Sequence, residues 1–533
     1  MEDAMGLHGK NIIGTELSAL SEKTFFGFDP RAGKQLDTPF HEAAEAEINR
    51  SLELATGAFP ILRETSPAVI CGFLECIAAE IEALGERLIE QAAAESGLGR
   101  ERLTGERGRT MSQLRLFANL VKDGSFLEAR LDTALPDRKP VPRPDLRRMM
   151  IPVGPVVVFG ASNFPLAFSV AGGDTASALA AKNPVVVKGH PAHPGTSELV
   201  AGAIVRATQA AGLPKGTFSL VHGVDPAVSL SLVRHPLAKA VAFTGSKRAG
   251  DAIFQAATRR PEPIPAYVEM GSTNPVFLLP GALQQRADDL AQGLTRSINL
   301  GVGQFCTCPG LIFGLQDTAF RAFMDKLASA FEDSLPATML HPGVLKGYEE
   351  SVARLTTIEG VIEKRSLQPS NSARTEARPV LFEADARTWL ANKELAQEVF
   401  GPSAVLIHAR SDEELLHLAT SLPGTLTATV HGTAEDLKHY RTLVTALESK
   451  CGRLIFNGYP TGVEVSHAMH HSGPYPATTD PKFTSVGTAA IFRFLRPICY
   501  QDSPDEVLPP ELQRGNPRNI WRAVDGHLTR EPG

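Results

Sequence analysis

One cysteine of this chain stands in a setting that suits covalent catalysis. The segment Gly303-Gln304-Phe305-Cys306-Thr307-Cys308-Pro309-Gly310 places a thiol beside glycines and an amide, in a chain with only six cysteines. A thiolate attacks a carbonyl carbon readily and also leaves readily, so a cysteine here could form a covalent intermediate. Six cysteines in 533 residues indicate reduced thiols in a cytosol.

A metal site is the alternative for these cysteines. Cys306 and Cys308 form a close pair, but no second pair of Cys or His accompanies them at zinc spacing. His467, His470 and His471 cluster later in the chain, yet the sequence does not connect them to the cysteines. We therefore expect no metal.

Two further side chains could assist a thiol nucleophile. Glu269 lies among apolar residues before a glycine, a setting that would raise the pKa of a carboxyl group and suit it to act as a general base. Asn163, in a Ser-Asn-Phe-Pro segment, offers an amide donor for an oxyanion. Taken singly, Glu269 is equally a surface group and Asn163 equally a helix cap.

Other residues suit the binding of a nucleotide. The segment from Gly245 and Ser246 to Gly250 places glycines at a predicted strand-to-helix turn, where a helix N-terminus favours phosphate. A structural turn explains it equally well, because the spacing is not that of a Walker A loop. Lys188 ends an apolar run just before His190 and could reach a ribose hydroxyl or a phosphate; the alternative is a solvated lysine.

The elements that would position these residues alternate between strands and helices. Strands are predicted at 156–159, 185–188, 218–221 and 241–243, with helices near 168–182, 195–212 and 226–234. This alternation predicts an α/β fold with a parallel sheet covered on both faces, and ligands at the carboxyl ends of its strands. Asn163, Lys188 and Gly245 fall at such ends.

Further elements are predicted on either side of this region. Helices are expected over 66–97, with Ser66 as N-cap and Pro67 at the first helical position, and over 105–121. A second α/β region begins near 272, with strands expected at 276–279, 311–313, 404–407 and 426–430.

Composition describes a soluble globular protein of two or three domains, with 43% hydrophobic and 21% charged residues. A net charge of −6 gives no general reason to bind nucleic acid or an anionic membrane. The first residues, Met1 to Gly6, lack the basic-then-apolar order of a signal peptide. Prolines and glycines break the apolar stretch 151–171, so we expect no membrane span and a cytoplasmic location.

Read together and in this order, the motifs resemble the aldehyde dehydrogenase superfamily over nearly the whole chain. The matching segments are Ser162–Pro165, Lys188, Phe243–Gly250, Glu269–Gly271, Gly303–Cys306 and Glu398-Val399-Phe400-Gly401-Pro402. The resemblance implies a Rossmann-type cofactor domain, a catalytic α/β domain and a small oligomerisation arm.

The resemblance also assigns the chemistry. Cys306 would attack an aldehyde, and Asn163 with the Cys306 backbone N–H would hold the oxyanion of the thiohemiacetal. Hydride transfer to a nicotinamide would leave a thioester, and Glu269 would activate the water that hydrolyses it. The family register selects Cys306 rather than Cys308, although Gly310 stands one residue later than the family pattern places it.

The cofactor residues follow from the same resemblance. Lys188 would bind the adenosine ribose, Glu398 the nicotinamide ribose, and Phe400 would pack near the nicotinamide, with Gly245, Ser246 and Gly250 near the pyrophosphate. NAD-preferring members commonly carry a glutamate three residues after this lysine, where the chain has Pro191. Without that carboxylate, and with His190 nearby, NADP should serve at least as well as NAD.

Three segments narrow the substrate. Residues 188–197, 471–477 and 480–487 resemble the branch that contains 2,5-dioxovalerate (α-ketoglutarate semialdehyde) dehydrogenases, which form 2-oxoglutarate. The alternative is an NADP-dependent medium- or long-chain fatty aldehyde dehydrogenase. Arg109, on the helix that lines the aldehyde tunnel in the family, could anchor a substrate carboxylate or could be an ordinary surface arginine. Gln113 and Phe164 are the other expected substrate contacts, and Arg296 is a second candidate cation.

The expected domains are a cofactor domain (1–134 and 150–270), a catalytic domain (271–475), an oligomerisation arm (135–149 and 488–502) and a C-terminal tail (503–533). The arm would build a homodimer or homotetramer. Two other functions remain open: a CoA-acylating dehydrogenase, which the presence of Glu269 disfavours, and a non-enzymatic binding protein on the same fold.

Overall fold

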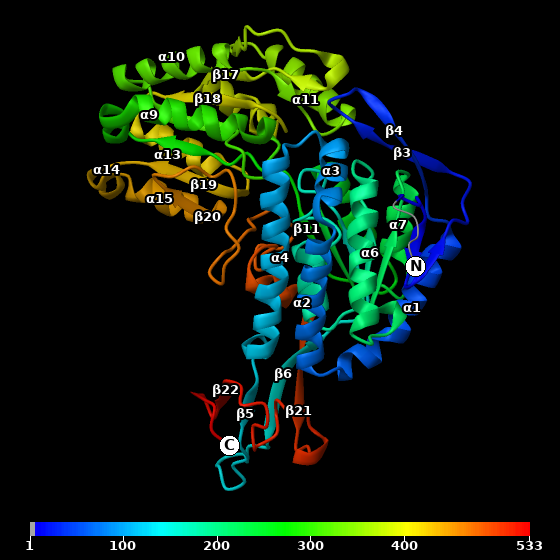
Figure 1. The fold of residues 1–533 in the computed structure, drawn as a ribbon. Coiled ribbons are helices and arrows are strands. Elements are labelled where there is room, and N and C mark those ends of the chain that lie inside the picture. Colours follow the sequence, from blue (N-terminus) through cyan, green and yellow to red (C-terminus); the bar gives the residue numbers. More distant parts are fainter. Residues whose placement is uncertain (1–5, 533) are drawn as a thin grey trace.

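The computed structural model of the protein describes residues 6–532, which form two α/β parts and a protruding arm (Figure 1). Residues 1–5, to which the signal-peptide expectation refers, lie outside this range. Within residues 6–532 no helix is long and apolar enough to cross a membrane.

The first part is a seven-stranded sheet between two layers of helices. Its strands, in spatial order, are β11 (Ala266–Glu269), β10 (Ala240–Thr244), β7 (Val156–Phe159), β8 (Val185–Lys188), β9 (Phe218–Val221), β1 (Asn11–Ile13) and β2 (Glu16–Ser18). The first five run parallel, which confirms the predicted α/β sheet. The chain reverses its winding direction between β7 and β10, and such a switch point is where open parallel sheets bind ligands.

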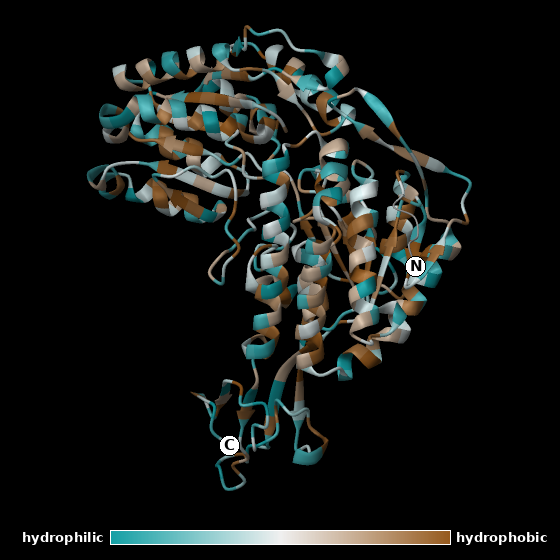
Figure 2. Ribbon diagram, viewed as in Figure 1, coloured by the Kyte–Doolittle hydropathy of each residue, from teal (hydrophilic) through white to brown (hydrophobic). Residues whose placement is uncertain are grey.

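Alternate residues of strand β7 face two different hydrophobic cores. Val156 and Val158 pack with one layer of helices, whereas Val157 and Phe159 pack with the other. The helices of this part are α1 (Glu45–Glu64), α2 (Pro67–Ala83), α3 (Gly85–Ser96), α4 (Arg100–Asp123), α5 (Gly173–Ala180), α6 (Pro194–Ala210), α7 (Pro226–Arg234) and α8 (Lys247–Thr258). Figure 2 shows the resulting hydrophobic strands between helices whose outer faces are hydrophilic.

The predicted helix over 66–97 is wrong in one respect: it is two helices. Ser66 does cap α2, accepting a hydrogen bond from the Val69 N–H, and Pro67 begins the helix. The break falls at Gly85, whose φ of +56° is a backbone conformation that a continuing right-handed helix does not allow. The second predicted helix, α4, starts earlier than expected and ends at Gly124, also with positive φ.

The second part is another seven-stranded sheet. In spatial order its strands are β15 (Ile362–Arg365), β17 (Val380–Asp385), β18 (Ser403–Ala409), β13 (Leu311–Leu315), β12 (Val276–Leu278), β19 (Thr425–His431) and β20 (Cys451–Phe456). Its helices are α9 (Pro280–Asn299), α10 (Thr318–Asp333), α11 (Pro342–Thr356), α12 (Ala386–Ala391), α13 (Asp412–Ser421), α14 (Ala434–His439) and α15 (Arg441–Glu448). All but β15 run parallel.

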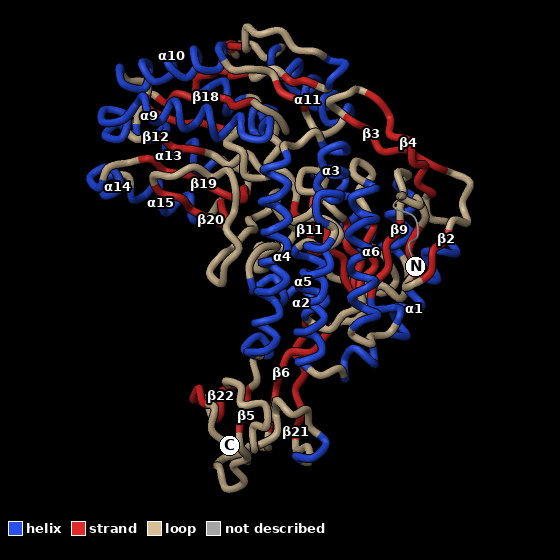
Figure 3. The backbone as a smooth tube through the Cα atoms, in the orientation of Figure 1, coloured by secondary structure: helices blue, strands red, loops and turns tan. Residues whose placement is uncertain are grey.

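The arm is a five-stranded sheet that extends away from both parts (Figure 3). Its strands are β21 (Leu495–Gln501), β6 (Leu146–Pro152), β5 (Arg130–Asp132), β22 (Arg522–Val524) and β23 (His527–Thr529). The C-terminal tail thus contributes two strands of its own to the arm. Two further pairs are small: β3 (Thr24–Asp29) with β4 (Lys34–His41), and β14 (Ala337–Thr338) with β16 (Glu376–Ala377).

Candidate active site

The loop that carries Cys306 connects α9 to β13 and is built around closely packed glycines. Gly303 has a φ of +67°, and a Cβ on it would come within 2.1 Å of the Gly401 carbonyl oxygen, so no side chain fits there. Farther along, the Asn274 side-chain amide donates to the carbonyl oxygens of Cys306 (2.8 Å) and Cys308 (2.9 Å). The backbone on both sides of Cys306 is therefore fixed.

The two thiols of this loop have different surroundings. Cys308 is buried, its sulfur lies 3.6 Å from the Ile298 carbonyl oxygen, and burial raises its pKa strongly. Cys306 is only half-buried. Because the thiolate is the reactive form of a cysteine, these surroundings favour Cys306 as nucleophile, the choice that the sequence motif also indicates.

A histidine joins Cys306 to Glu269. His471 Nε2 lies 3.4 Å from Cys306 Sγ and 3.0 Å from Glu269 Oε1. The Ser485 hydroxyl donates to the other carboxylate oxygen of Glu269 at 2.5 Å. The interpretation that nothing connects the histidine cluster to the cysteines is wrong for His471. The fold brings His471 to Cys306 although 165 residues of chain separate them.

Electrostatics makes Glu269 and His471 an ion pair. Burial alone would raise the pKa of Glu269, but the His471 imidazolium and the hydrogen bonds from His471 and Ser485 outweigh it and lower that pKa. Burial alone would lower the pKa of His471, but the charges of Glu269 and Cys306 outweigh it and raise that pKa. The raised carboxyl pKa expected from the apolar sequence around Glu269 is therefore wrong in direction, since that expectation lacked the histidine.

The Asn163 amide lies beside the nucleophile loop. Its Nδ2 donates to the Gln304 carbonyl oxygen at 3.0 Å, and the backbone carbonyl oxygen of Asn163 accepts from Arg102 Nη2 at 2.8 Å. The Arg102 guanidinium also stacks on Phe164 and Phe305, with its central carbon 5.1 and 4.8 Å from the ring centroids. A side-chain amide carries two N–H groups, so one remains available for an oxyanion.

Lys188 and its neighbours lie at the carboxyl edge of the first sheet. Lys188 ends β8 and is only 8% exposed, and burial lowers its pKa to about 8, although the charge of Glu42 opposes this. His190 stacks on His193, with centroids 5.5 Å apart. Burial lowers the pKa of His190 well below its usual value, so its imidazole is neutral near neutral pH.

The two glycines at the turn between β10 and α8 differ in their exposure. Gly245 and Ser246 are exposed, and the Ser246 hydroxyl accepts from the Ala249 N–H at the start of α8. Gly250 is buried instead, and a Cβ on it would come within 2.7 Å of Val268 and Met270 side chains. Gly250 thus lets the helix pack closely on the sheet, while Gly245 and Ser246 face outward.

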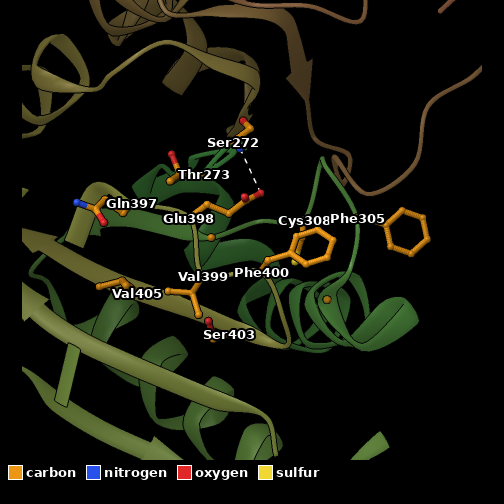
Figure 4. Close-up of a pocket in the computed structure, with 12 residues that line it drawn as sticks. Ser272, Thr273, Phe305, Cys308, Gln397, Glu398, Val399, Phe400, Ser403 and Val405 are labelled. Carbon is orange, nitrogen blue, oxygen red and sulfur yellow. Dashed lines mark hydrogen bonds between the residues drawn. The ribbon is translucent and has the colours of Figure 1, made fainter. Parts of the chain in front are cut away.

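A pocket lined in part by the nucleophile loop contains Glu398 and Phe400 (Figure 4). The Ser272 N–H donates to Glu398 Oε1 at 3.2 Å, and a Cβ on Gly271 would lie 2.2 Å from Glu398 Oε2. Burial raises the pKa of Glu398 to about 7, against that hydrogen bond. Figure 4 shows the Glu398 carboxylate pointing to Ser272, with this hydrogen bond dashed.

One face of α4 presents polar groups toward the aromatic residues near Cys306. The Arg109 guanidinium lies over Phe168 and Phe164, 5.3 and 5.9 Å from their centroids. Its Nε and Nη2, like Gln113 Nε2, are buried without a hydrogen-bond partner among the described residues. Burial lowers the pKa of Arg109, although the charges of Glu106, Cys306 and Glu464 oppose it.

The second candidate cation, Arg296, is exposed on α9, so the geometry favours Arg109. Sequence reasoning missed Arg102, Glu106 and Phe168. Glu106 accepts from the backbone N–H groups of Leu166 and Ala167 at 2.8 and 3.0 Å, which fixes the segment after Asn163. The spacing of residues 102, 106, 109 and 113 on one helical face was the signal that could have revealed this group.

The aldehyde dehydrogenase family pattern matches residues 19–474. The chain belongs to this family. Within the family, the enzyme is 49% identical over 525 residues to alpha-ketoglutaric semialdehyde dehydrogenase 2 of Azospirillum brasilense, covering 98% of this chain and 99% of the relative. It is 46% identical over 523 residues to alpha-ketoglutaric semialdehyde dehydrogenase of Acinetobacter baylyi, with the same coverage.

Solved structures show the same fold at low sequence identity. A 1-pyrroline-5-carboxylate dehydrogenase from Thermus with bound NAD superimposes with a TM-score of 0.78 at 21% identity, and 93% of each chain is covered. This aldehyde dehydrogenase is therefore an oxidoreductase with the family fold, and the family uses NAD or NADP as cofactor.

Proposed function

We propose that this aldehyde dehydrogenase oxidises 2,5-dioxovalerate to 2-oxoglutarate with NADP, through a thioester on Cys306. The observation that carries the substrate assignment is the Arg109 guanidinium, which has two buried N–H groups free of partners among residues 6–532. Two relatives of nearly identical length, both named for this substrate, support the assignment.

The first step uses the three side chains around the thiol. The Cys306 thiol loses its proton to solvent, and the His471 imidazolium, 3.4 Å away and held by its ion pair with Glu269, stabilises the thiolate. The thiolate attacks the aldehyde carbon, and the carbonyl oxygen becomes the oxyanion of a thiohemiacetal. An N–H of Asn163 and the Cys306 backbone N–H are the donors for that oxyanion.

The cofactor site fits a dinucleotide. Because Gly271 lacks a Cβ, the Glu398 carboxylate can lie against its backbone, in the pocket that also contains Phe400. We assign Glu398 to the nicotinamide ribose, Lys188 to the adenosine ribose, and Gly245 and Ser246 to the pyrophosphate. When bound, the cofactor supplies the hydride acceptor for the thiohemiacetal.

Hydrolysis completes the reaction. The thioester on Cys306 carries no charge, so the sulfur no longer holds the His471 imidazolium in place. Glu269 is ionised and takes a proton from the water that attacks the thioester carbon, which releases the carboxylate product and the thiol. The retained Glu269 favours water over CoA as the acceptor.

NADP use rests on the missing carboxylate at position 191. Pro191 follows Lys188 and His190 where a glutamate would repel a 2′-phosphate. The test is the Pro191→Glu variant, assayed with both cofactors against a Pro191→Gln control. We expect the Glu variant alone to lose about 10-fold or more in the kcat/KM ratio of NADP over NAD, or about 1.4 kcal/mol. A wild-type enzyme with a large NAD preference would refute NADP use.

The response to loss of Arg109 distinguishes the oxo-acid substrate from the fatty aldehyde alternative, in which this arginine would contact no substrate carboxylate. A charged hydrogen bond is worth about 1.5–3 kcal/mol, so Arg109→Met should raise KM for 2,5-dioxovalerate by about 10- to 150-fold and leave KM for pentanal nearly unchanged. Arg115→Met is the matched control, since Arg115 is an exposed arginine of the same helix. An unchanged KM for the oxo-acid in Arg109→Met would remove the anchor.

We infer a homo-oligomer from the arm. Strand β21 is the edge of the arm sheet and pairs on one side only, with β6, among the described residues. An open edge strand is a ready template for pairing with a second chain. Light scattering on the purified enzyme tests this, and a monomer at micromolar concentration would exclude it.

A further inference from the structure

The three side chains around the nucleophile also form a set of metal ligands. One ligand atom from each of Cys306, His471 and Glu269 lies within 4.8 Å of the other two. Among residues 6–532, this is the one group of three or more His, Cys, Asp or Glu side chains with such spacing. Thiolate, imidazole and carboxylate are the three ligand types that zinc binds in proteins.

Two of the three separations are close to those that a tetrahedral ion imposes. Bonds of about 2.3 Å to sulfur and about 2.0–2.1 Å to nitrogen or oxygen place a sulfur ligand about 3.6 Å from a nitrogen or oxygen ligand, and a nitrogen ligand about 3.3 Å from an oxygen ligand. The observed separations are 3.4 Å from Sγ to Nε2 and 3.0 Å from Nε2 to Oε1. The third, from Sγ to a carboxylate oxygen of Glu269, lies within 4.8 Å, so binding the ion requires side-chain shifts of up to about 1 Å.

We propose that Cys306, His471 and Glu269 bind one divalent zinc-class cation, which inhibits the enzyme reversibly. Binding replaces the thiol proton and the hydrogen bonds between these groups with bonds to the metal, so the thiol, the base and their connecting histidine are blocked together. Because Cys306 is half-buried rather than enclosed, water can fill the fourth position, as in zinc sites with three protein ligands.

The surroundings set the selectivity. Cys308 is buried with its sulfur directed to the Ile298 carbonyl oxygen and takes no part. The guanidinium groups of Arg109 and Arg453 interact electrostatically with Cys306. Their positive charges oppose a cation, but the thiolate and the carboxylate of the ligand set supply two negative charges that attract it. Soft thiolate coordination favours Zn²⁺ or Co²⁺ over Mg²⁺ and Ca²⁺.

The experiment titrates Co²⁺ into the full-length enzyme after treatment with EDTA and its removal, and follows the thiolate-to-cobalt absorption band. We expect saturation at one ion per chain, competition by Zn²⁺ and no band with Mg²⁺. Zn²⁺ should block alkylation of Cys306 by iodoacetamide and stop aldehyde oxidation, and EDTA should reverse both effects.

Variants identify the ligands. His471→Gln should weaken binding by about 100-fold or more, because it removes one of three ligands, whereas His470→Gln and Cys308→Ser should bind as the wild type does. A band that persists unchanged in His471→Gln, or its absence in the wild type, would overturn the proposal. If His471→Gln fails to fold, prior carboxymethylation of wild-type Cys306 must abolish the band. Because binding is read without aldehyde or cofactor, its outcome is independent of the substrate.

Discussion

Replacing His471 with glutamine should make Cys306 far less reactive near neutral pH. Two unit charges 4 Å apart interact by about 4 kcal/mol at an effective dielectric constant near 20, and the sulfur lies 3.4 Å from Nε2. Cys306 is half-buried and Glu269 partly neutralises the imidazolium, so the net effect is smaller. We take about 2 kcal/mol for the loss of this charge, or about 30-fold in the reactivity of Cys306.

The assay is the rate of alkylation of Cys306 by iodoacetamide near neutral pH, in buffer with EDTA. We expect this rate to fall by about 10-fold or more in His471→Gln. His470→Gln is the matched control, since the side chain of this adjacent histidine hydrogen-bonds only with the Pro481 carbonyl oxygen among the described groups. An unchanged rate in a His471→Gln enzyme with a normal melting curve would refute the role of His471.

Four other predictions concern the remaining parts of the site and the fold. In Glu269→Gln, steady-state turnover should fall by about 100-fold or more, yet a burst of about one NADPH per site should remain. Rapid mixing measures both quantities. A lost burst would show that Glu269 acts before hydride transfer. A lysine is charged below its pKa, and the pKa of Lys188 is about 8. KM for NADP should therefore rise as the pH rises through that value, and this pH dependence should vanish in Lys188→Met. A KM for NADP that does not change with pH in the wild type would contradict this. Gly271→Ala should weaken cofactor binding measured by calorimetry, since its Cβ would displace the Glu398 carboxylate. The control is Gly347→Ala, at an exposed position of α11 with no atom within 4 Å of the added Cβ. Phe117→Ala should lower the free energy of unfolding by about 3–5 kcal/mol, because this core residue is 1% exposed. Denaturant unfolding measures this change. A loss below about 1 kcal/mol, the scale of a surface substitution, would be inconsistent with the packing.

The sequence predicts the sheet of the cofactor part well because its strands are short apolar runs between glycines and prolines. The strand expected at 156–159 is β7 and that at 185–188 is β8, since residues buried on both faces leave an uninterrupted hydrophobic signal. The helix over 66–97 fails only at Gly85. An isolated glycine within a helical pattern is compatible with either continuation or a break, so periodicity alone could not locate it.

Some residues of the candidate site could be predicted from the sequence, and others could not. Cys306, Glu269 and Asn163 each lie in a recognisable motif, and the structure brings the first two to the same histidine. His471 begins the segment 471–477, but that resemblance gave the histidine no role. Its partner Glu269 lies 202 residues away in the chain, so only the fold reveals their contact. For the same reason the pKa of Glu269 moves in the direction opposite to that expected from its apolar neighbours, since a charged partner outweighs burial.

The most direct test compares kcat/KM for 2,5-dioxovalerate and for pentanal, two five-carbon aldehydes that differ in the carboxylate and the keto group, with NADP as cofactor. If Arg109 receives the carboxylate above Cys306, the oxo-acid should be preferred by about 100-fold or more, or about 2.7 kcal/mol, and Arg109→Met should remove most of that preference. Equal values for the two aldehydes, or higher values for pentanal and longer alkyl aldehydes, would contradict the assignment.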